Sequence, residues 1–345
     1  MMVDAHRVID IAGGGLAGLS LGIALRNRGV PVRLHEAMSY PKHRVCGEFI
    51  SGVTNKTLSF LGIERLFDHT LLHREATWCN ADGVLSSFRL PQAAYGISRY
   101  RLDEQLCSLL RSMGGTVMEG SRIGTEHRAR EGTVWAVGRK PTNQAQWLGL
   151  KMHVRGIELR TSLEMHLGDW GYVGLAQVED EWVNVCGLFR IRPDVRERPQ
   201  DLLIEYLRRC GLVELAGRLT RAHHREGSYA AVAGFSLGRQ QLQSGTCSIG
   251  DAESIIPPFT GHGMSMALQS AELAVEPLVA YAQGMTDWET CTQHMRASQL
   301  RHFRRRLGVA QSFHFALFDP MWRRPVEILA QNDLLPLRLL FSLTR

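Results

Sequence analysis

The hydrophobic pattern changes period near the start of the chain. Residues 7–12 (RVIDIA) are mostly apolar and typical of a short strand, and residues 16–28 then place apolar side chains at helical spacing. Residues 30–36 (VPVRLHE) predict a second strand. Because three glycines at 13–15 separate the first strand from the helix, the pattern predicts a strand, a tight turn, a helix and another strand.

Short alternating runs fill the middle of the chain. Residues 76–90 form two strand-like runs around Asp82-Gly83, which is a strong hairpin signal. Four further runs predict antiparallel strands with one buried face. They are residues 149–156, 163–167, 171–178 and 182–191. Residues 200–220 are typical of one or two amphipathic helices.

The C-terminal third begins with a strand and ends in helical patterns. Residues 247–278 predict a strand ending at Gly250-Asp251, then a loop with prolines, then a helix that starts near residues 261–264. Residues 286–345 are helical in pattern and rich in arginine and leucine. No internal repeat or low-complexity tract interrupts this order.

Composition places the chain among globular proteins. It has 345 residues, of which 44% are hydrophobic and 21% charged. This length exceeds most single cores, so we expect two packed units. The net charge of +6 suits an acidic ligand or an anionic surface, and a diphosphate-bearing cofactor would absorb part of it.

The seven cysteines predict neither disulfides nor a zinc site. Their number is odd and no two form a Cys-x-x-Cys pair, so a reducing, cytoplasmic location is expected. The first residues carry no apolar signal region, and no stretch approaches eighteen uninterrupted apolar residues. We expect no metal site, since His-Glu-x-x-His is missing and His223 and His224 are adjacent.

The glycine-rich turn matches G-x-G-x-x-G in the context that this motif requires. Gly13 allows the tight turn, Gly15 lets the backbone of Leu16 and Ala17 approach a pyrophosphate, and Gly18 lets the helix pack on the strand. The N-terminus of the helix then faces the negative charge. Glu36 ends the second strand and can bind a ribose diol, and its charge disfavours a 2′-phosphate. FAD or NAD is therefore predicted rather than NADP.

The region 247–278 favours FAD over NAD. A strand that ends in Gly250-Asp251 places a carboxylate beside a ribityl chain. The helix that begins at Gly261, Gly263 and Met264 points its positive N-terminus at whatever lies above it, which would stabilise a reduced flavin.

Two further stretches bear on the family, residues 98–103 (SRYRLD) and residues 41–48 (PKHRVCGE). With them, the chain resembles the FAD-dependent oxidoreductases of the para-hydroxybenzoate hydroxylase fold, and among them the geranylgeranyl reductase-like branch. Residues 98–103 (SRYRLD) resemble the R-x-x-L-D motif of that family, in which the arginine, here Arg99, lies near the FAD phosphates. Residues 41–48 (PKHRVCGE) look like P-x-x-K-x-C-G with Arg44 in place of lysine. The four motifs span about residues 7–280.

The resemblance implies an α/β fold, α+β overall: a Rossmann-like FAD/NAD(P)-binding domain, an antiparallel β-sheet substrate domain and C-terminal helices. The expected FAD-binding domain is discontinuous, with pieces at 1–72, 95–140 and 245–285. Residues 73–94 and 141–244 would form the substrate sheet, and 286–345 a helical region.

The resemblance also places the segment of residues 41–48 along the flavin, with Arg44, Cys46 and Gly47 as cofactor contacts. Cys46 could take part in protonation or substrate handling. The alternative is a small residue that accommodates the edge of the ring, and this alternative is favoured.

Several positions depart from relatives of this fold. Lipid-reducing relatives carry Y-x-W-x-F-P where this chain has residues 172–176 (YVGLA), which counts against a long polyprenyl substrate and favours Tyr172 as a sheet residue. Many hydroxylases carry Asp-Gly where this chain has Val137-Gly138-Arg139, which weakens direct NADPH binding. The W-x-W-x-I-P motif of flavin halogenases is missing. Residues 234–238 match G-x-S-x-G, but no apolar helix follows, so a serine hydrolase is not expected.

The leading hypothesis is an FAD-dependent monooxygenase that acts on a small apolar or aromatic biosynthetic intermediate, with NAD(P)H as electron donor. Two alternatives stay open: an FAD-dependent C=C reductase and a non-catalytic FAD-binding scaffold. The basic run 301–308 is typical of a solvated helix face, although the C-terminal helices could also rest on a membrane surface. Aromatic residues do not alternate with its charges, so nucleic acid is not expected as a partner.

Overall fold

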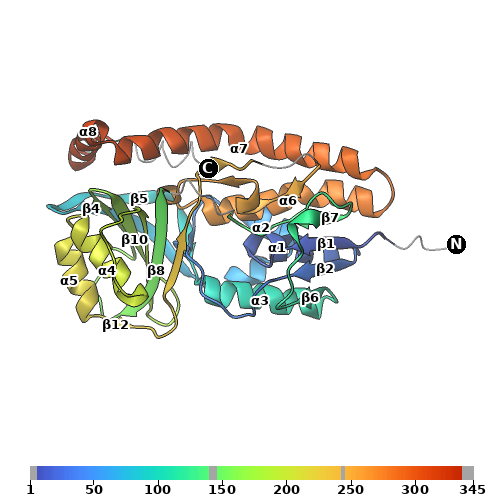
Figure 1. Ribbon diagram of the computed structural model, residues 1–345, viewed down its shortest axis with the longest axis horizontal. Helices are drawn as coiled ribbons and strands as arrows, with labels where there is room; N and C mark the ends of the chain where they lie inside the picture. Colours follow the sequence, from blue (N-terminus) through green and yellow to red (C-terminus); the bar gives the residue numbers. More distant parts are fainter. Residues whose placement is uncertain (1–5, 140–145, 242–244, 336–345) are drawn as a thin grey trace.

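Two sheets lie side by side, and the last helices of the chain extend across both (Figure 1). The computed structural model describes residues 6–139, 146–241 and 245–335. The predicted fold class is confirmed: a Rossmann-like parallel sheet, a separate sheet domain and C-terminal helices.

The first sheet has five strands in the order β15-β7-β1-β2-β6, and every pair in it is parallel. The strands are β1 (Ile9–Ala12), β2 (Val32–His35), β6 (Thr116–Met118), β7 (Thr133–Trp135) and β15 (Cys247–Ser248). They come from three separate stretches of sequence. Because the strands are parallel, their carboxyl ends meet at one edge, where ligands bind in open α/β sheets.

Helices pack on this sheet and share its core. They are α1 (Leu16–Arg26), α2 (Asn55–Leu61), α3 (Arg99–Ser112) and α6 (Gly263–Ala282). The side chain of Ser98 caps α3 by accepting the N–H of Arg101 at 3.1 Å. No side chain caps α1 or α6 among the described residues, so the first N–H groups of both helices stay available.

The second sheet has nine strands in the order β12-β8-β11-β10-β9-β4-β5-β3, with β13 also paired to β8. The strands are β3 (Phe49–Ile50), β4 (Leu71–Asn80), β5 (Gly83–Gly96), β8 (Trp147–Arg155), β9 (Leu163–Gly168), β10 (Gly171–Gln177), β11 (Val183–Arg190), β12 (His223–His224) and β13 (Ala230–Ala233). The predicted hairpin is present as β4 and β5, and all four strands predicted between residues 149 and 192 are found.

The four middle strands pair antiparallel with one another, as expected. The sheet also contains one parallel pair, formed by β9 and β4. The expectation of a single buried face was wrong, because every residue of β9 is buried. Helices α4 (Pro199–Arg209) and α5 (Val213–Arg221) cover one face, and the C-terminal helices pack against the other.

The C-terminal helices are α7 (Trp288–Phe318) and α8 (Pro320–Gln331). Figure 1 shows α7 running along α6 and onward over the second sheet, where α8 packs on β5. None of the described helices combines the length and apolar character that crossing a bilayer requires. The remaining short strands, β14 (Gly238–Arg239) and β16 (Ser254–Ile255), pair with each other near the loop that precedes α6.

We predict that Gly18→Ala destabilises the whole fold. A Cβ on Gly18 would lie 2.1 Å from the carbonyl oxygen of Gly13, so α1 would have to move away from β1. Overpacking of this kind costs about 1–3 kcal/mol of the free energy of unfolding. The control is Gly217→Ala in α5, where the nearest atom would be an Arg221 guanidinium nitrogen at 3.6 Å. Urea unfolding should show the control as stable as the wild type or up to about 1 kcal/mol more stable, and equal losses in both variants would contradict the prediction.

Candidate functional site

The turn between β1 and α1 contains two glycines, Gly13 and Gly15, whose missing side chains shape the turn and the space beside it. Gly13 has a φ of +107°, and a Cβ there would lie 2.3 Å from the carbonyl oxygen of Ala136. At Gly15 a Cβ would meet nothing closer than an Arg99 guanidinium nitrogen at 3.9 Å. The N–H groups of Leu16 and Ala17 follow in the uncapped first turn. This arrangement can bind an anion such as a pyrophosphate.

Glu36 lies directly after β2 and faces this turn. Its side chain is only 6% exposed, and its carboxylate accepts the N–H groups of Gly14 at 2.9 Å and Met38 at 3.0 Å. The Lys42 ammonium lies 2.6 Å and the Arg44 guanidinium 3.2 Å from the same carboxylate. Burial acts to raise the pKa of Glu36, but the contact with Lys42 and the charge of Arg44 outweigh it, so the pKa lies below its ordinary value. Glu36 is therefore an anion at neutral pH, and a ribose hydroxyl would share or replace one of its cationic contacts.

Two arginines meet on a buried carboxylate beside Gly15. Arg99 makes a two-pronged ion pair with Asp103, at 2.7 and 2.8 Å, and Arg44 contacts the same carboxylate at 2.8 Å. Arg44 also donates to the carbonyl of Gly14 at 3.1 Å. Among the described residues, Lys42, Arg44 and Arg99 share two carboxylates, Glu36 and Asp103, near the N-terminus of α1. The surplus charge favours an anionic ligand at this place.

The start of α6 provides a second open helix terminus at the same sheet edge. Gly261 adopts the left-handed conformation, with φ +67°, and its Cβ would meet the ring of Phe49 at 2.1 Å. A Cβ on Gly263 would meet no atom within 4 Å. Met264 is buried in the first turn of α6. This part of the site thus combines backbone N–H groups with free space above them.

Asp251 forms an ion pair with Arg139, which lies where many hydroxylases of this fold carry Asp-Gly and for which the sequence predicted no contact. Its carboxylate lies 3.1 Å from the Arg139 guanidinium, which also donates to the carbonyl of Val45 at 3.4 Å and lies over the Phe235 ring. Arg139 therefore joins three loops at the edge of the first sheet. A ligand hydroxyl that bonds Asp251 would share this carboxylate with Arg139.

Cys46 and Gly47 lie between the two sheets. The carbonyl of Cys46 accepts the Asn184 amide at 2.9 Å, which ties this segment to β11. Burial raises the pKa of the Cys46 thiol, although the charge of Arg99 acts against it, so the thiol is protonated at neutral pH. A thiolate role for Cys46 is thereby disfavoured, and the favoured interpretation of a small residue stays a prediction. A Cβ on Gly47 would meet the Phe49 ring at 3.1 Å.

Glu48 forms a buried charged cluster that the sequence analysis missed. The side chain is fully buried with φ +57°, and its carboxylate lies 2.5 Å from His153 Nε2 and 3.3 Å from Lys151 Nζ. It also accepts the N–H of Arg99 at 3.1 Å. Burial acts to raise the pKa of Glu48, but His153 and Lys151 reverse this and leave it below its ordinary value. The Glu48 carboxylate thus connects the segment before β3 with the start of α3 and with strand β8.

The same cluster contains three groups of the metal-ligand type. Ligand atoms of His43, Glu48 and His153 lie within 4.8 Å of one another. However, Lys151 Nζ lies 2.9 Å from His43 Nδ1 as well as beside Glu48. Because this ammonium already serves as the cation of the cluster, the arrangement fits an ion pair better than a metal centre.

Tyr172 is a residue of strand β10, as predicted. It is buried, and its hydroxyl accepts the N–H of Phe259 at 2.9 Å, which ties the second sheet to the loop before α6. Burial raises its pKa well above the ordinary value, so the phenol stays protonated.

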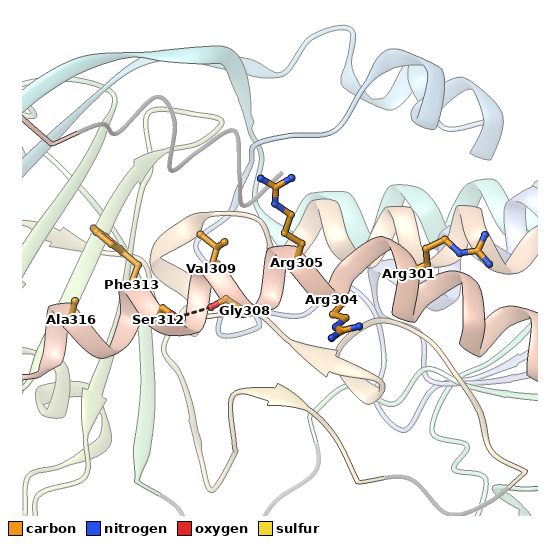
Figure 2. A pocket seen from close by; sticks show the side chains of 8 residues that line it. All are labelled: Arg301, Arg304, Arg305, Gly308, Val309, Ser312, Phe313 and Ala316. Atoms are coloured by element: carbon orange, nitrogen blue, oxygen red, sulfur yellow. Dashed lines mark hydrogen bonds between the residues drawn. The ribbon is translucent and has the colours of Figure 1, made fainter.

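The basic run on α7 borders an open pocket of about 800 Å³ (Figure 2). Its lining residues are Arg301, Arg304, Arg305, Gly308, Val309, Ser312, Phe313 and Ala316. All of them belong to α7, and Figure 2 shows Ser312 donating to the carbonyl of Gly308. Farther along, Met321 and Trp322 of α8 are exposed. Contact of these helices with a membrane surface stays a prediction.

We predict that Glu48→Gln is strongly destabilising and changes the response to acid. The variant leaves Lys151 buried without a counter-charge, a change that costs about 3–5 kcal/mol. In the wild type the lowered pKa of Glu48 adds stability above about pH 4.5, and this stability is lost as the pH falls through the folded-state value. The variant lacks that contribution, so its stability should fall less steeply in acid.

Urea unfolding from pH 7 to pH 3 measures both effects, because the loss of stability lies below about pH 4.5. Glu75→Gln is the control, because Glu75 makes only an exposed ion pair with Arg89 at 3.4 Å. The control should change the free energy of unfolding by less than about 1 kcal/mol. A Glu48→Gln protein as stable as the wild type at pH 7 would refute the bridging role of this carboxylate.

Comparison with known proteins finds similar structures but no match in sequence. No family model matches the chain, and no curated protein matches it in sequence. Among solved structures, p-nitrophenol 4-monooxygenase PnpA from Pseudomonas putida DLL-E4 matches with a TM-score of 0.76 at 13% identity, over 98% of this chain and 96% of that one. The flavin-dependent brominase Bmp2 matches with a TM-score of 0.70 at 18% identity, over 94% and 93%. PqsL of P. aeruginosa, solved with 2-aminobenzoylacetate, matches with a TM-score of 0.70 at 12% identity, over 95% and 99%. The chain therefore has the fold of flavin-dependent monooxygenases and halogenases.

Proposed function

We propose that this protein is an FAD-dependent oxidoreductase, and specifically a monooxygenase that acts on a small apolar or aromatic biosynthetic intermediate with NAD(P)H as electron donor. The observation that carries the proposal is the pair of uncapped helix termini, α1 and α6, at one edge of the parallel sheet. A glycine lies at each terminus, Gly15 before α1 and Gly263 at the start of α6, and its missing Cβ leaves space there.

The donors and acceptors at this edge fit an FAD molecule. The turn at residues 13–18 and the first N–H groups of α1 would bind the pyrophosphate, with the Arg99 charge beside them. Glu36 would bind the ribose of the adenosine half, and its negative charge disfavours a 2′-phosphate. Asp251 would bond the ribityl chain, and the N-terminus of α6 would lie nearest the flavin ring.

When bound, the flavin supplies the redox chemistry, while the protein binds, orients and shields the reactants. The second sheet turns a mostly apolar face toward α7 and α8, with Trp78 and Tyr172 on this face and Phe313 of α7 packed against it. This composition supports an aromatic or apolar substrate. The bound 2-aminobenzoylacetate of PqsL shows that a protein of this fold can bind such a compound.

A second candidate is an FAD-dependent C=C reductase of the geranylgeranyl reductase type. The protonated Cys46 thiol favours it, because a reduction of an alkene needs a proton donor beside the flavin. The departure from Y-x-W-x-F-P at residues 172–176 counts against a long polyprenyl chain in this candidate. A membrane contact through α7 and α8 would fit this candidate better than the first.

We predict that Gly15→Ala weakens FAD binding while the free protein stays folded. Gly15 has φ −89°, which alanine tolerates, so loss of the glycine cap should cost at most about 1 kcal/mol. The added Cβ would project into the space proposed for the pyrophosphate, and a loss of about 1.4 kcal/mol corresponds to tenfold weaker binding. Calorimetric titration with FAD measures the affinity, and Gly308→Ala on the exposed side of α7 is the control. If Gly15→Ala bound FAD as tightly as the wild type, the proposed position of the pyrophosphate at this turn would be wrong.

The reaction itself is tested by the visible spectrum of the FAD-loaded protein under anaerobic conditions, before and after addition of NADPH or NADH. We expect the flavin absorption to bleach, because a monooxygenase requires reduction of its cofactor before oxygen is used. Admission of air in the presence of an aromatic substrate should then restore the spectrum with consumption of oxygen. Bleaching followed by slow re-oxidation and saturation of an alkene would favour the reductase. A spectrum that no nicotinamide changes would favour the non-catalytic scaffold.

A further inference from the structure

His314 lies inside an aromatic cluster between α7 and the second sheet. It is 7% exposed, and its ring centre lies 4.6 Å from that of Phe318 and 5.0 Å from that of Trp147. The rings of Phe259 and Tyr172 lie at 6.1 and 6.4 Å, with Phe259 stacked nearly parallel to the imidazole. These four aromatic neighbours come from β8, β10, α7 and the loop before α6.

Neither ring nitrogen of His314 has a hydrogen-bond partner among the described residues. A buried polar group without a partner costs about 1–3 kcal/mol, and most such groups in folded proteins are paired. A phenylalanine or leucine would therefore be more stable in this cluster. Because the described residues offer the imidazole no hydrogen-bond partner, its position is better explained by a bound molecule that enters the cluster.

The cluster is connected to the proposed flavin site. Phe259 lies in the loop that leads into α6, and its N–H donates to the Tyr172 hydroxyl at 2.9 Å. The apolar face of the second sheet, which includes Trp78, continues from this cluster. A flat molecule bound at the edge of these rings would lie between the second sheet and the start of α6.

The imidazole is neutral under physiological conditions. Burial lowers the pKa of His314 to about 3, and the charge of Arg190 acts in the same direction. A neutral imidazole has one N–H donor and one acceptor nitrogen. It can therefore accept a hydrogen bond from a neutral hydroxyl or N–H group, which a purely hydrocarbon ligand does not offer.

We infer that His314 is a substrate-binding residue, whose imidazole accepts a hydrogen bond from a hydroxyl or N–H group on a flat aromatic substrate held beside Trp147, Tyr172 and Phe259. This inference rests on the proposed oxidoreductase function and narrows its substrate class. Polyprenyl chains lack such a group, so the reductase of long isoprenoids is not the activity that this residue serves.

The test compares pairs of probes that differ only in the donor group. 2-Naphthol and 2-methoxynaphthalene form one pair, and indole and 1-methylindole form the other. Calorimetry with the FAD-loaded wild type should show binding about fivefold tighter for the donor-bearing member of at least one pair, which is the range of one net hydrogen bond. His314→Phe should bind both members of that pair equally, and His314→Gln should recover part of the preference. His294→Phe, an exposed histidine on the same helix, is the matched control and should keep the wild-type preference.

Thermal unfolding separates a binding role from a structural one. The His314→Phe protein should melt at the same temperature as the wild type or a few degrees higher, since the substitution removes no hydrogen bond between described residues. A lower melting temperature of His314→Phe than of the wild type would show that His314 stabilises the folded protein, and this would overturn the inference. It is also overturned if the wild type binds neither member of either pair, if it binds both members equally, or if His314→Phe keeps the preference.

The visible absorption of FAD in the same samples distinguishes the two levels of failure. Wild-type protein that cannot be loaded with FAD contradicts the proposed function. Wild-type protein that retains FAD but shows no preference within either probe pair contradicts only the role of His314.

Discussion

The close packing of α1 against the turn after β1 is the constraint on which the candidate site depends. A Cβ on Gly18 would lie 2.1 Å from the Gly13 carbonyl, so the helix can approach the turn only because that side chain is missing. This packing also places Gly14 next to Glu36, at the end of β2, and next to the segment that contains Tyr40 and Arg44. Its N–H donates to Glu36, and its carbonyl accepts both the Tyr40 hydroxyl at 2.5 Å and the Arg44 guanidinium. The N-terminal end of α1 and the acidic residue beside it are thus fixed by one steric condition.

Buried charge then connects this unit to the second sheet. Asp103 forms ion pairs with Arg44 and Arg99. The backbone N–H of Arg99 donates to the Glu48 carboxylate, which also contacts His153 of β8. Paired buried charges are costly to separate, because removing one partner leaves the other without compensation in a medium of low polarity. The two sheets are therefore held in a definite relation across the region where a cofactor would lie. Arg139 and Asp251 form a further, partly exposed ion pair between the segments that follow β7 and β15 of the first sheet.

The sequence predicted the local elements well because their signals are local. The glycine turn, the Asp82-Gly83 hairpin and the start of α6 each depend on a few neighbouring residues, and each is found in the structure. The burial of β8 and β9 was not predicted. Their alternating polar residues, such as Lys151 and Glu164, had the pattern of a solvent-facing side, yet both are buried and paired with other charged or polar groups. An alternating pattern cannot distinguish water from a buried counter-charge as the partner of a polar side chain.

Residues brought together from distant parts of the sequence were also beyond prediction. The partners Glu48 and His153 are 105 positions apart, and Arg139 and Asp251 are 112 apart. His314 lay in a stretch interpreted only as helical, and nothing in its neighbours along the chain indicates four aromatic rings around it. Such contacts depend on how α7 and the two sheets pack, which the pattern of a single segment does not contain.

The central claim is that the edge of the five-stranded sheet binds a flavin–adenine dinucleotide through both of its halves. The most direct test is calorimetric titration of the cofactor-free protein with FAD, ADP and riboflavin 5′-phosphate. We expect FAD to bind most tightly, ADP to bind more weakly through Glu36 and the N-terminus of α1, and riboflavin 5′-phosphate to bind weakest because it lacks the adenosine half. Absence of FAD binding, or equal affinity for FAD and riboflavin 5′-phosphate, would contradict the account.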